Sequence, residues 1–196
     1  MKHVGLMGGT FDPIHLGHLL VAETARDLCG LDEVWFIPSR TPPLKSGEPS
    51  AAGEDRLDMV RLAIAGNPAF RALDVELSRP GVSYSIDTVT ELGARHPECR
   101  FSYIIGGDRV NDLARWHRIE ELAASVAFIG VARPGHPVDI GALPKFLQER
   151  VRVIPMPQLD ISSSAIRRLV KEGRSIRYLV PDGVHDFIRK KGLYGS

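Results

Sequence analysis

Two kinds of apolar pattern alternate along this chain. Short continuous apolar runs, typical of buried strands, lie between longer segments in which apolar residues recur every three or four positions, as in amphipathic helices. Because apolar strands that alternate with helices form parallel sheets, the pattern predicts an α/β fold, a Rossmann-like open parallel sheet with helices on both faces. The expected strands are residues 3–7, 34–37, 72–77, 101–105, 126–132 and 151–154, and the expected helices are residues 16–28, 54–65, 85–95, 119–124, 163–171 and 184–191.

The length of the chain favours one domain. With 196 residues, of which 43% are hydrophobic, the chain can bury one substantial core. We expect a single domain over residues 1–196, with a small C-terminal helical segment, about residues 160–196, packed on it. Residues 39–53 are rich in Pro, Gly and Ser, which predicts a mobile surface loop. A loop of this length inside a compact domain is commonly a lid or a binding loop, and a disordered insertion is the alternative.

Charge and cysteine content argue against several classes of protein. The 25 Lys and Arg residues balance 24 Asp and Glu residues, for a formal charge of +1, so no long-range field favours nucleic acid or an anionic membrane as a partner. Cys29 and Cys99 are far apart and form no CxxC pair, which fits neither a disulfide framework nor a zinc cluster. The N-terminal apolar run is too short for a signal peptide, and no later run is long enough to span a bilayer. We therefore expect a cytoplasmic location.

The first candidate site is residues 8–18, which read Gly-Gly-Thr-Phe-Asp-Pro-Ile-His-Leu-Gly-His and lie where the first expected strand gives way to the first helix. Ligands of open α/β sheets bind beyond the carboxyl ends of the strands, and glycines there let backbone N–H groups approach phosphate oxygens. No Gly-Lys-Ser/Thr follows and no GxGxxG is present, so neither a Walker loop nor a dinucleotide oxidoreductase fingerprint is supported. The pattern predicts an anion site of another kind.

His15 and His18 are the candidate functional side chains of this segment. They are one helical turn apart, so both imidazoles can point from one helix face toward the glycine turn. An isolated pair at this spacing can also cap a helix, or hold a metal ion that needs further ligands from elsewhere in the fold. Their place beside the glycine turn favours phosphate binding.

The second candidate site is residues 160–168, Asp-Ile-Ser-Ser-Ser-Ala-Ile-Arg-Arg, which follow a strand and open a helix. Serine is a favoured N-cap, and three serines in a row can do no more than start the helix. Free N–H groups, three hydroxyls and Arg167 one turn further would form a second phosphate cradle. Together the two segments suggest a polyphosphate held between two helix N-termini.

Residues 8–18 together with residues 161–167 resemble the HxGH nucleotidyltransferase superfamily, and specifically the bacterial nicotinate-nucleotide adenylyltransferases. The resemblance covers nearly the whole chain. The first and second segments are typical of the superfamily, whereas the intervening segments favour this member over pantetheine-phosphate or glycerol-phosphate relatives. Further similar segments are residues 42–45, 84–88, 105–108, 116–117 and 178–182.

The resemblance implies a reaction in which nicotinate mononucleotide and ATP, accompanied by Mg²⁺, give deamido-NAD and pyrophosphate. It implies catalytic roles for His15, His18, Lys45 and Arg167, and no metal ligand from the protein itself. By the same resemblance, the ATP-binding residues are Gly8, Gly9, Thr10, Phe11, Gly106, Asp108, Ile161, Ser162, Ser163 and Ser164, and the acceptor-binding residues are Tyr84, Thr88 and Trp116. Relatives commonly carry histidine where this chain has Leu44, which leaves the contribution of Lys45 open.

Other functions remain open at this point. The same enzyme could accept nicotinamide mononucleotide or a phosphopantetheine-like phosphate, because a few hydrogen-bond donors around one substituent decide the acceptor. A binding module that senses nucleotides without chemistry is a second alternative, but it would have no need of His15, His18 and Arg167. Homo-oligomers are common among such enzymes, and the sequence leaves the oligomeric state open.

Overall fold

The computed structural model describes residues 1–41, 50–132, 135, 138–157 and 159–195. Leu44 and Lys45, and with them the central part of the expected loop at residues 39–53, lie outside the described residues. The strands are β1 (Lys2–Gly9), β2 (Glu33–Pro38), β3 (Phe70–Ala72), β4 (Cys99–Gly106), β5 (Ala127–Ala132) and β6 (Val151–Pro155). The helices are α1 (Leu16–Cys29), α2 (Gly53–Ile64), α3 (Ser85–Arg95), α4 (Gly107–Val110), α5 (Ile119–Ser125), α6 (Lys145–Gln148), α7 (Ser163–Lys171) and α8 (Asp182–Lys191), with short 3-10 turns η1 (Leu113–Arg115), η2 (Ile140–Ala142) and η3 (Leu193–Gly195).

The strands form one six-stranded parallel sheet in the order β3-β2-β1-β4-β5-β6. This is the Rossmann order. The chain adds β2 and β3 on one side of β1 and then returns to add β4, β5 and β6 on the other side, so the strand order reverses between β1 and β4. The predicted fold class, a Rossmann-like open parallel sheet, is therefore confirmed. Crevices at such a reversal lie beyond the carboxyl ends of the strands, and both candidate segments lead away from this edge of the sheet.

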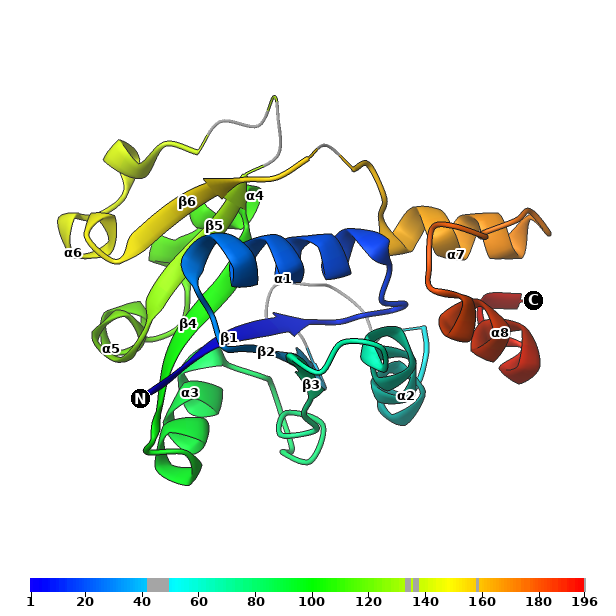
Figure 1. Ribbon diagram of the computed structural model, residues 1–196, viewed down its shortest axis with the longest axis horizontal. Helices are drawn as coiled ribbons and strands as arrows, with labels where there is room; N and C mark the ends of the chain where they lie inside the picture. Colours follow the sequence, from blue (N-terminus) through cyan, green and yellow to red (C-terminus); the bar gives the residue numbers. More distant parts are fainter. Residues whose placement is uncertain (42–49, 133–134, 136–137, 158, 196) are drawn as a thin grey trace.

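Successive residues of each strand point to opposite faces of the sheet, and each face has its own hydrophobic core. In β2, Val34 and Phe36 pack with α1 and α2, whereas Trp35 and Ile37 pack with α3 and α5. This period of two is what a strand buried on both faces requires. Figure 1 shows α1 above the sheet and α3 below it, so helices cover both faces as predicted.

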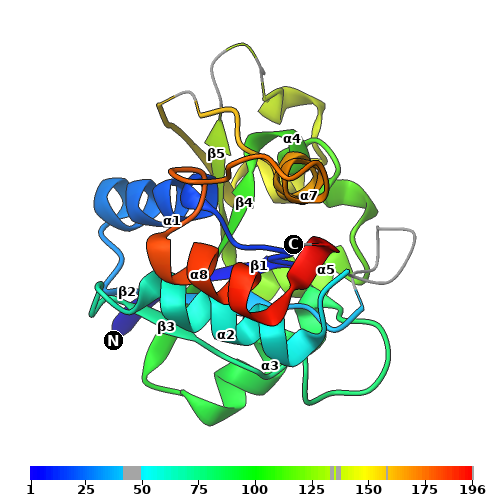
Figure 2. The ribbon, with the colours of Figure 1, turned by 90° about the vertical axis from the view of Figure 1, so that its right-hand side faces the viewer.

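The C-terminal helices gather at the carboxyl end of the strands. Figure 1 places α7, α8 and the C-terminus at the end toward which β1 points, and Figure 2 looks onto this end of the molecule. Buried Ile166 of α7 and buried Val184 and Ile188 of α8 belong to the same core as α1 and α2. The C-terminal segment thus closes one side of the region where the candidate site lies.

One predicted strand is wrong. Residues 72–77 were expected to be extended, but β3 covers Phe70–Ala72 and the chain then leaves the sheet. The N–H of Ser78 donates to the carbonyl of Asp74, closing a turn, while Val75 is buried in the core on the α3 side. The apolar residues of this segment therefore lie in a buried turn. Their spacing is the same as that of an edge strand, so the sequence pattern alone does not distinguish the two structures.

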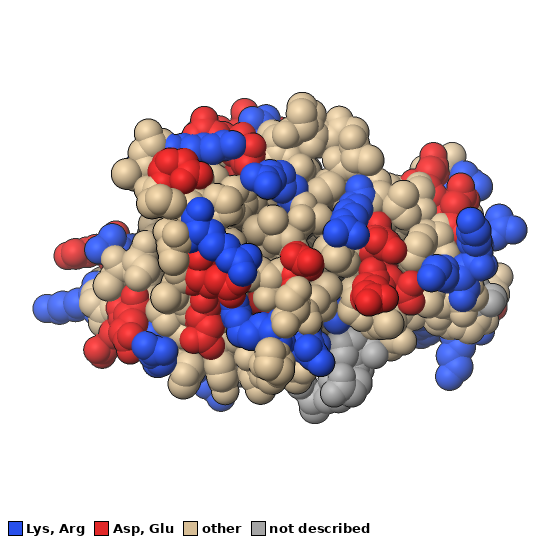
Figure 3. Space-filling model, turned by 90° about the horizontal axis from the view of Figure 1, so that it is seen from below, with Lys and Arg blue, Asp and Glu red and all other residues tan. Residues whose placement is uncertain are grey.

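Other expectations hold closely. The helices predicted at residues 85–95 and 163–171 are found with the same bounds. The short helices α4 and α6 were not predicted, because one turn of helix carries too little periodicity to read from sequence. Among the described residues, no helix is long and apolar enough to cross a membrane. Figure 3 shows acidic and basic side chains intermixed over the face on the α3 side.

Candidate nucleotide site

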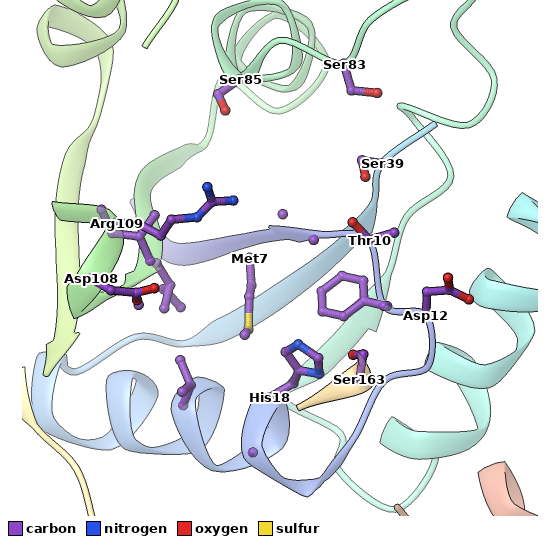
Figure 4. Close-up of a pocket in the computed structure, with 18 of the residues that line it drawn as sticks. Met7, Thr10, Asp12, His18, Ser39, Ser83, Ser85, Asp108, Arg109 and Ser163 are labelled. Carbon is purple, nitrogen blue, oxygen red and sulfur yellow. The ribbon is translucent and has the colours of Figure 1, made fainter. Parts of the chain in front are cut away.

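A cavity of about 1180 Å³ opens at the carboxyl ends of β1 and β4. Its volume exceeds the range of roughly 300–1,000 Å³ common for pockets that hold one small ligand, so two nucleotide-sized substrates can share it. Figure 4 shows side chains that converge on it from the β1–α1 turn, the loop before α3, the start of α4 and the start of α7. The site residues expected from sequence that line it are Gly8, Gly9, Thr10, Phe11, His15, His18, Tyr84, Gly106, Asp108, Trp116, Ile161, Ser162, Ser163, Ser164 and Arg167.

The glycines at the end of β1 are needed for close packing. A Cβ on Gly8 would clash with the hydroxyl of Tyr103, and a Cβ on Gly9 would lie 2.9 Å from the ring of Phe11. Phe11 itself has φ 50, a left-handed conformation that residues with side chains seldom adopt. Its ring packs edge-on against His18 at 5.1 Å. The turn is therefore built as a compact unit under the cavity.

The two histidines form one stacked unit at the N-terminus of α1. Their rings are 3.7 Å apart at an angle of 26°. His15 is the N-cap residue, and its backbone N–H donates to Nδ1 of His18 at 3.2 Å. Because Nδ1 accepts this hydrogen bond, the ring proton of His18 is on Nε2, which can donate to an anion. The side chain of His18 can thus cap the helix through Nδ1 and bind a ligand through Nε2.

Gly17, between the two histidines, has to be small because the ring of His15 packs against it. A Cβ at this position would lie 3.0 Å from atoms of the His15 ring. That distance is tighter than ordinary van der Waals contact, so any larger residue would displace the imidazole. The spacing His-x-Gly-His therefore packs one histidine ring against the helix backbone.

The second segment meets the first as expected. Ser162 caps α7, its hydroxyl accepting from the N–H of Ala165. The hydroxyl of Ser163 donates to the carbonyl of Pro13 at 2.9 Å, and Nη1 of Arg167 donates to the carbonyl of Asp12 at 2.7 Å. Two segments some 150 residues apart in sequence thus join beside one cavity, and the N-termini of α1 and α7 both face it.

Asp12 is a site residue that sequence reasoning did not single out. The residue is only 4% exposed, and its carboxylate accepts hydrogen bonds from the backbone N–H groups of Ser50 and Ala51 and from the hydroxyl of Tyr194. Nη1 of Arg167 lies 3.9 Å from the same carboxylate. Buried carboxylates need such donors, and an acidic residue within the glycine-rich turn is the sequence signal that could have identified it.

A further wall of the cavity is the start of α4. A Cβ on Gly106 would lie 2.7 Å from Oδ1 of Asp108, so the glycine lets this carboxylate fold back over the end of β4. Arg109 also lines the cavity, and Figure 4 shows its guanidinium pointing inward. Its position directly after Gly106-Gly107-Asp108 was available in the sequence, but no pattern distinguished it from a solvated arginine.

Aromatic rings line the cavity beside the loop before α3 and after η1. Tyr84 and His117 lie 4.2 Å apart at 30°, and Trp116 packs edge-on against Tyr103 at 5.6 Å. His117 belongs to a segment that resembles the family but was given no role. The arrangement offers flat apolar surface of the kind an aromatic base or pyridine ring stacks on.

Thr88 does not reach the cavity. It is fully buried, and its hydroxyl donates to Oε1 of Glu76 at 2.8 Å. The direct acceptor contact expected for Thr88 is therefore not what this geometry provides, because α3 turns the side chain inward. Glu76, Ser83 and Ser85 line the cavity in its place, and so does Ser39, whose buried hydroxyl has no hydrogen-bond partner among the described residues.

Burial governs the ionisation of this end of the cavity. Desolvation raises the pKa of Glu76 above its ordinary value, opposed by the hydrogen bonds from Thr88 and Ser83 and by the charge of Arg79. Desolvation, and then the charge of Glu76, raises the pKa of Tyr103 so that its phenol stays protonated. Tyr103 is therefore a hydrogen-bonding partner near neutral pH and does not act as a phenolate base.

The site thus combines a Rossmann-type sheet with stacked histidines at one helix N-terminus and serines and an arginine at another, an arrangement suited to binding the phosphates of a nucleotide. Residues 6–169 match the family model described as cytidylyltransferase-like. A protein of Geobacillus thermodenitrificans named "Probable nicotinate-nucleotide adenylyltransferase" is 46% identical over 196 residues, which cover 100% of this chain and 88% of that protein. A Geobacillus kaustophilus protein of the same name is 47% identical with the same coverage. The chain belongs to the cytidylyltransferase-like family and, within it, to the nicotinate-nucleotide adenylyltransferases.

Solved structures support the fold independently. The Plasmodium falciparum nicotinic acid mononucleotide adenylyltransferase complexed with NaAD superposes with a TM-score of 0.81. The match covers 99% of this chain and 98% of that one at 24% sequence identity. At this level of identity the likeness speaks for the architecture, and it agrees with the strand order described above.

Proposed function

We propose that this protein transfers the adenylyl group of ATP to the phosphate of nicotinate mononucleotide, forming deamido-NAD and pyrophosphate in NAD biosynthesis. The observation that carries the proposal is the meeting of two helix N-termini, one with His15 and His18 and the other with Arg167, beside one cavity. The names of the relatives, which match this chain over its whole length, support the choice of acceptor.

The chemistry needs alignment more than proton transfer. The second pKa of a phosphate monoester is near 6, so the acceptor phosphate is mostly dianionic at neutral pH and attacks without a general base. One of its oxygens forms a bond to the α-phosphorus of ATP, while the bond from that phosphorus to the bridging oxygen of the β-phosphate breaks. Pyrophosphate leaves in line with the electron pair of the broken bond, and no covalent enzyme intermediate forms.

In this proposal, the N-termini of α1 and α7 bind different phosphates of ATP. Nε2–H of His18, with His15 beside it, stabilises the charge on the α-phosphate oxygens as attack proceeds. Ser163, Ser164 and Arg167, with the free N–H groups of α7, hold the β- and γ-phosphates and the departing pyrophosphate. Donors aimed at charge that grows in the transition state contribute most to rate, because they are already oriented.

The remaining assignments distribute the two substrates over the cavity. Gly106 and Asp108 hold the adenosine, with the β1 turn beneath it. Tyr84 and Trp116 offer the nicotinate ring its flat surface, and Thr88 supports this wall through Glu76 without touching the ligand. A role for Lys45 as a further cation stays a prediction.

Nucleotidyltransferases of this family generally use a divalent metal ion with ATP. We propose Mg²⁺, which prefers phosphate and carboxylate oxygens as ligands and would neutralise charge on the leaving pyrophosphate. The site offers the triphosphate mainly nitrogen donors and hydroxyls, and the carboxylate of Asp12 already accepts three hydrogen bonds. This donor set fits a nucleotide that carries the ion on its own phosphates.

Three expectations stay predictions alongside this proposal. They are the organisation as one domain over residues 1–196, the cytoplasmic location, and the lack of nucleic-acid or membrane partners. The oligomeric state is left open by the geometry of a single chain.

Pyrophosphate release tests the acceptor. ATP and Mg²⁺ are offered with nicotinate mononucleotide, nicotinamide mononucleotide or phosphopantetheine, each at the same concentration, and the initial rate is measured. We expect a strong preference for the nicotinate form. Preference for another acceptor would overturn the substrate assignment while keeping the reaction class, and no release with any acceptor would overturn both.

A further inference from the structure

The last turn of the chain reaches the phosphate-binding turn. In η3, the hydroxyl of Tyr194 donates to Oδ1 of Asp12 at 2.8 Å, across 182 positions of sequence. The carboxylate can only accept, so the phenol is the donor. Burial, followed by the charge of Asp12, raises the pKa of Tyr194 well above its usual range, so the donor keeps its proton. Figure 1 shows the C-terminus at the same end of the molecule as the carboxyl end of β1.

The backbone of Tyr194 is held in an uncommon conformation. Its φ is 63, in the left-handed region that residues with side chains seldom adopt. Gly192 and Gly195, which flank this turn, also have positive φ, but they bear no side-chain penalty. The side chain of Tyr194 packs against the core shared by α1, α2 and α7. A strained residue that persists in this way often marks a functional contact.

Asp12 connects four separate segments. It lies in the β1–α1 turn, and its carboxylate accepts from the N–H of Ser50 at 2.7 Å and from the N–H of Ala51 at 3.1 Å, just before α2. The third donor is Tyr194. On the fourth side, Nη1 of Arg167 donates to the Asp12 carbonyl at 2.7 Å but remains 3.9 Å from the carboxylate. The guanidinium therefore lies beside a buried negative charge without closing a short ion pair.

This arrangement bears on how Arg167 can bind phosphate. If the guanidinium turned onto the carboxylate, the internal ion pair would compete with the triphosphate for the same N–H donors. The carboxylate of Asp12 already accepts hydrogen bonds from three donors. It therefore does not draw Arg167 onto itself, and Arg167 lines the cavity. Without the phenol, Oδ1 of Asp12 would lose one of its donors. Arg167, whose Nη1 is 3.9 Å from Oδ2 of the same carboxylate, could then turn toward it, whereas the buried Arg56 beside this turn donates to the carbonyls of Thr10 and Ala51.

We propose that Tyr194 is a positioning residue for adenylyl transfer: its hydroxyl occupies the carboxylate of Asp12 and so keeps Arg167 available to the phosphates of ATP. The inference rests on the proposed function, in which Arg167 holds the β- and γ-phosphates. It assigns a role in ATP binding to the C-terminal turn of the chain, far from the acceptor end of the cavity.

The test compares Tyr194→Phe with a matched control. Tyr194→Phe removes one oxygen atom and keeps the ring, whereas Tyr178→Phe makes the same change at a tyrosine that is 78% exposed. The Kd for ATP with Mg²⁺ is measured by titration calorimetry without acceptor, and the KM values for ATP and for the acceptor are measured separately. We expect Tyr194→Phe to weaken ATP binding about tenfold, with the acceptor KM unchanged and Tyr178→Phe equal to wild type.

A second background shows whether the effect passes through Arg167. In Arg167→Ala, the additional change Tyr194→Phe should leave ATP affinity where Arg167→Ala alone puts it, because the competing guanidinium is gone. Full additivity of the two losses would overturn the proposal, as would a lowered Tm of Tyr194→Phe with unchanged ATP affinity. ATP binding without acceptor is scored separately from turnover, so a wild-type enzyme that rejects nicotinate mononucleotide would overturn the proposed acceptor and leave this test intact.

Discussion

His18 has two separable roles, and two substitutions distinguish them. His18→Ala removes both the Nδ1 acceptor that binds the N–H of His15 and the Nε2 side of a ring that lines the cavity. His18→Asn places an amide oxygen near the position of Nδ1 and keeps the cap, but it is too short to replace Nε2. If Nε2–H stabilises the α-phosphate in the transition state, both variants should lose turnover by about 10²–10³, or roughly 2.7–4 kcal/mol, the usual loss for one such donor.

Stability should separate the two variants where turnover does not. Loss of the cap interaction at His15, which is 4% exposed, should cost about 1 kcal/mol and lower Tm by about 2–4 °C for a chain of this length. Only His18→Ala should show that shift. The assays are kcat under saturating substrates, the Kd for ATP, and thermal unfolding. Near-normal kcat in His18→Asn, or a loss confined to ATP affinity, would refute the reasoning.

Three further substitutions test other parts of the site. Arg167→Ala should reduce kcat/KM for ATP by about 10–100-fold through both affinity and rate, whereas Arg168→Ala, on the exposed side of α7, should match wild type; equal effects would contradict the assignment. Gly17→Ala should displace the ring of His15 and lower turnover about tenfold or more in steady-state assays, so normal turnover would show that this packing is unimportant. Burial raises the pKa of Glu76 above its ordinary value of 4.5, so stability is lost as pH rises from that value through the raised pKa of the folded protein. Glu76→Gln should therefore gain Tm relative to wild type as pH rises through this window, and a gain that shrinks with rising pH would contradict the cause given for the shift.

Features that depend on neighbours in sequence were predictable. The bounds of α3 and α7 follow from local periodicity and from the serine cap at Ser162. The sheet followed from strands that are apolar throughout, and glycines, histidines and serines at strand-to-helix junctions pointed to the two segments that line the cavity. In these cases the information lies within one or two helical turns.

Features that depend on distant partners were not predictable. Asp12 gains its role from the backbone of Ser50, from Arg167 and from Tyr194, which are 38, 155 and 182 positions away. Thr88 was expected to face the acceptor, but Glu76 binds its hydroxyl from a turn that looks like a strand in sequence. The hydrogen-bond partners in a buried polar network are set by the folded structure, and the spacing of residues along the chain does not encode them.

Transfer of label from ATP tests the central claim most directly. The enzyme is incubated with nicotinate mononucleotide and ATP labelled on either the α- or the γ-phosphate, and the products are separated. Adenylyl transfer predicts that α-label enters deamido-NAD while γ-label leaves as pyrophosphate in equal amount. Label from the γ-phosphate in the acceptor, or α-label released as free AMP without dinucleotide, would contradict the account.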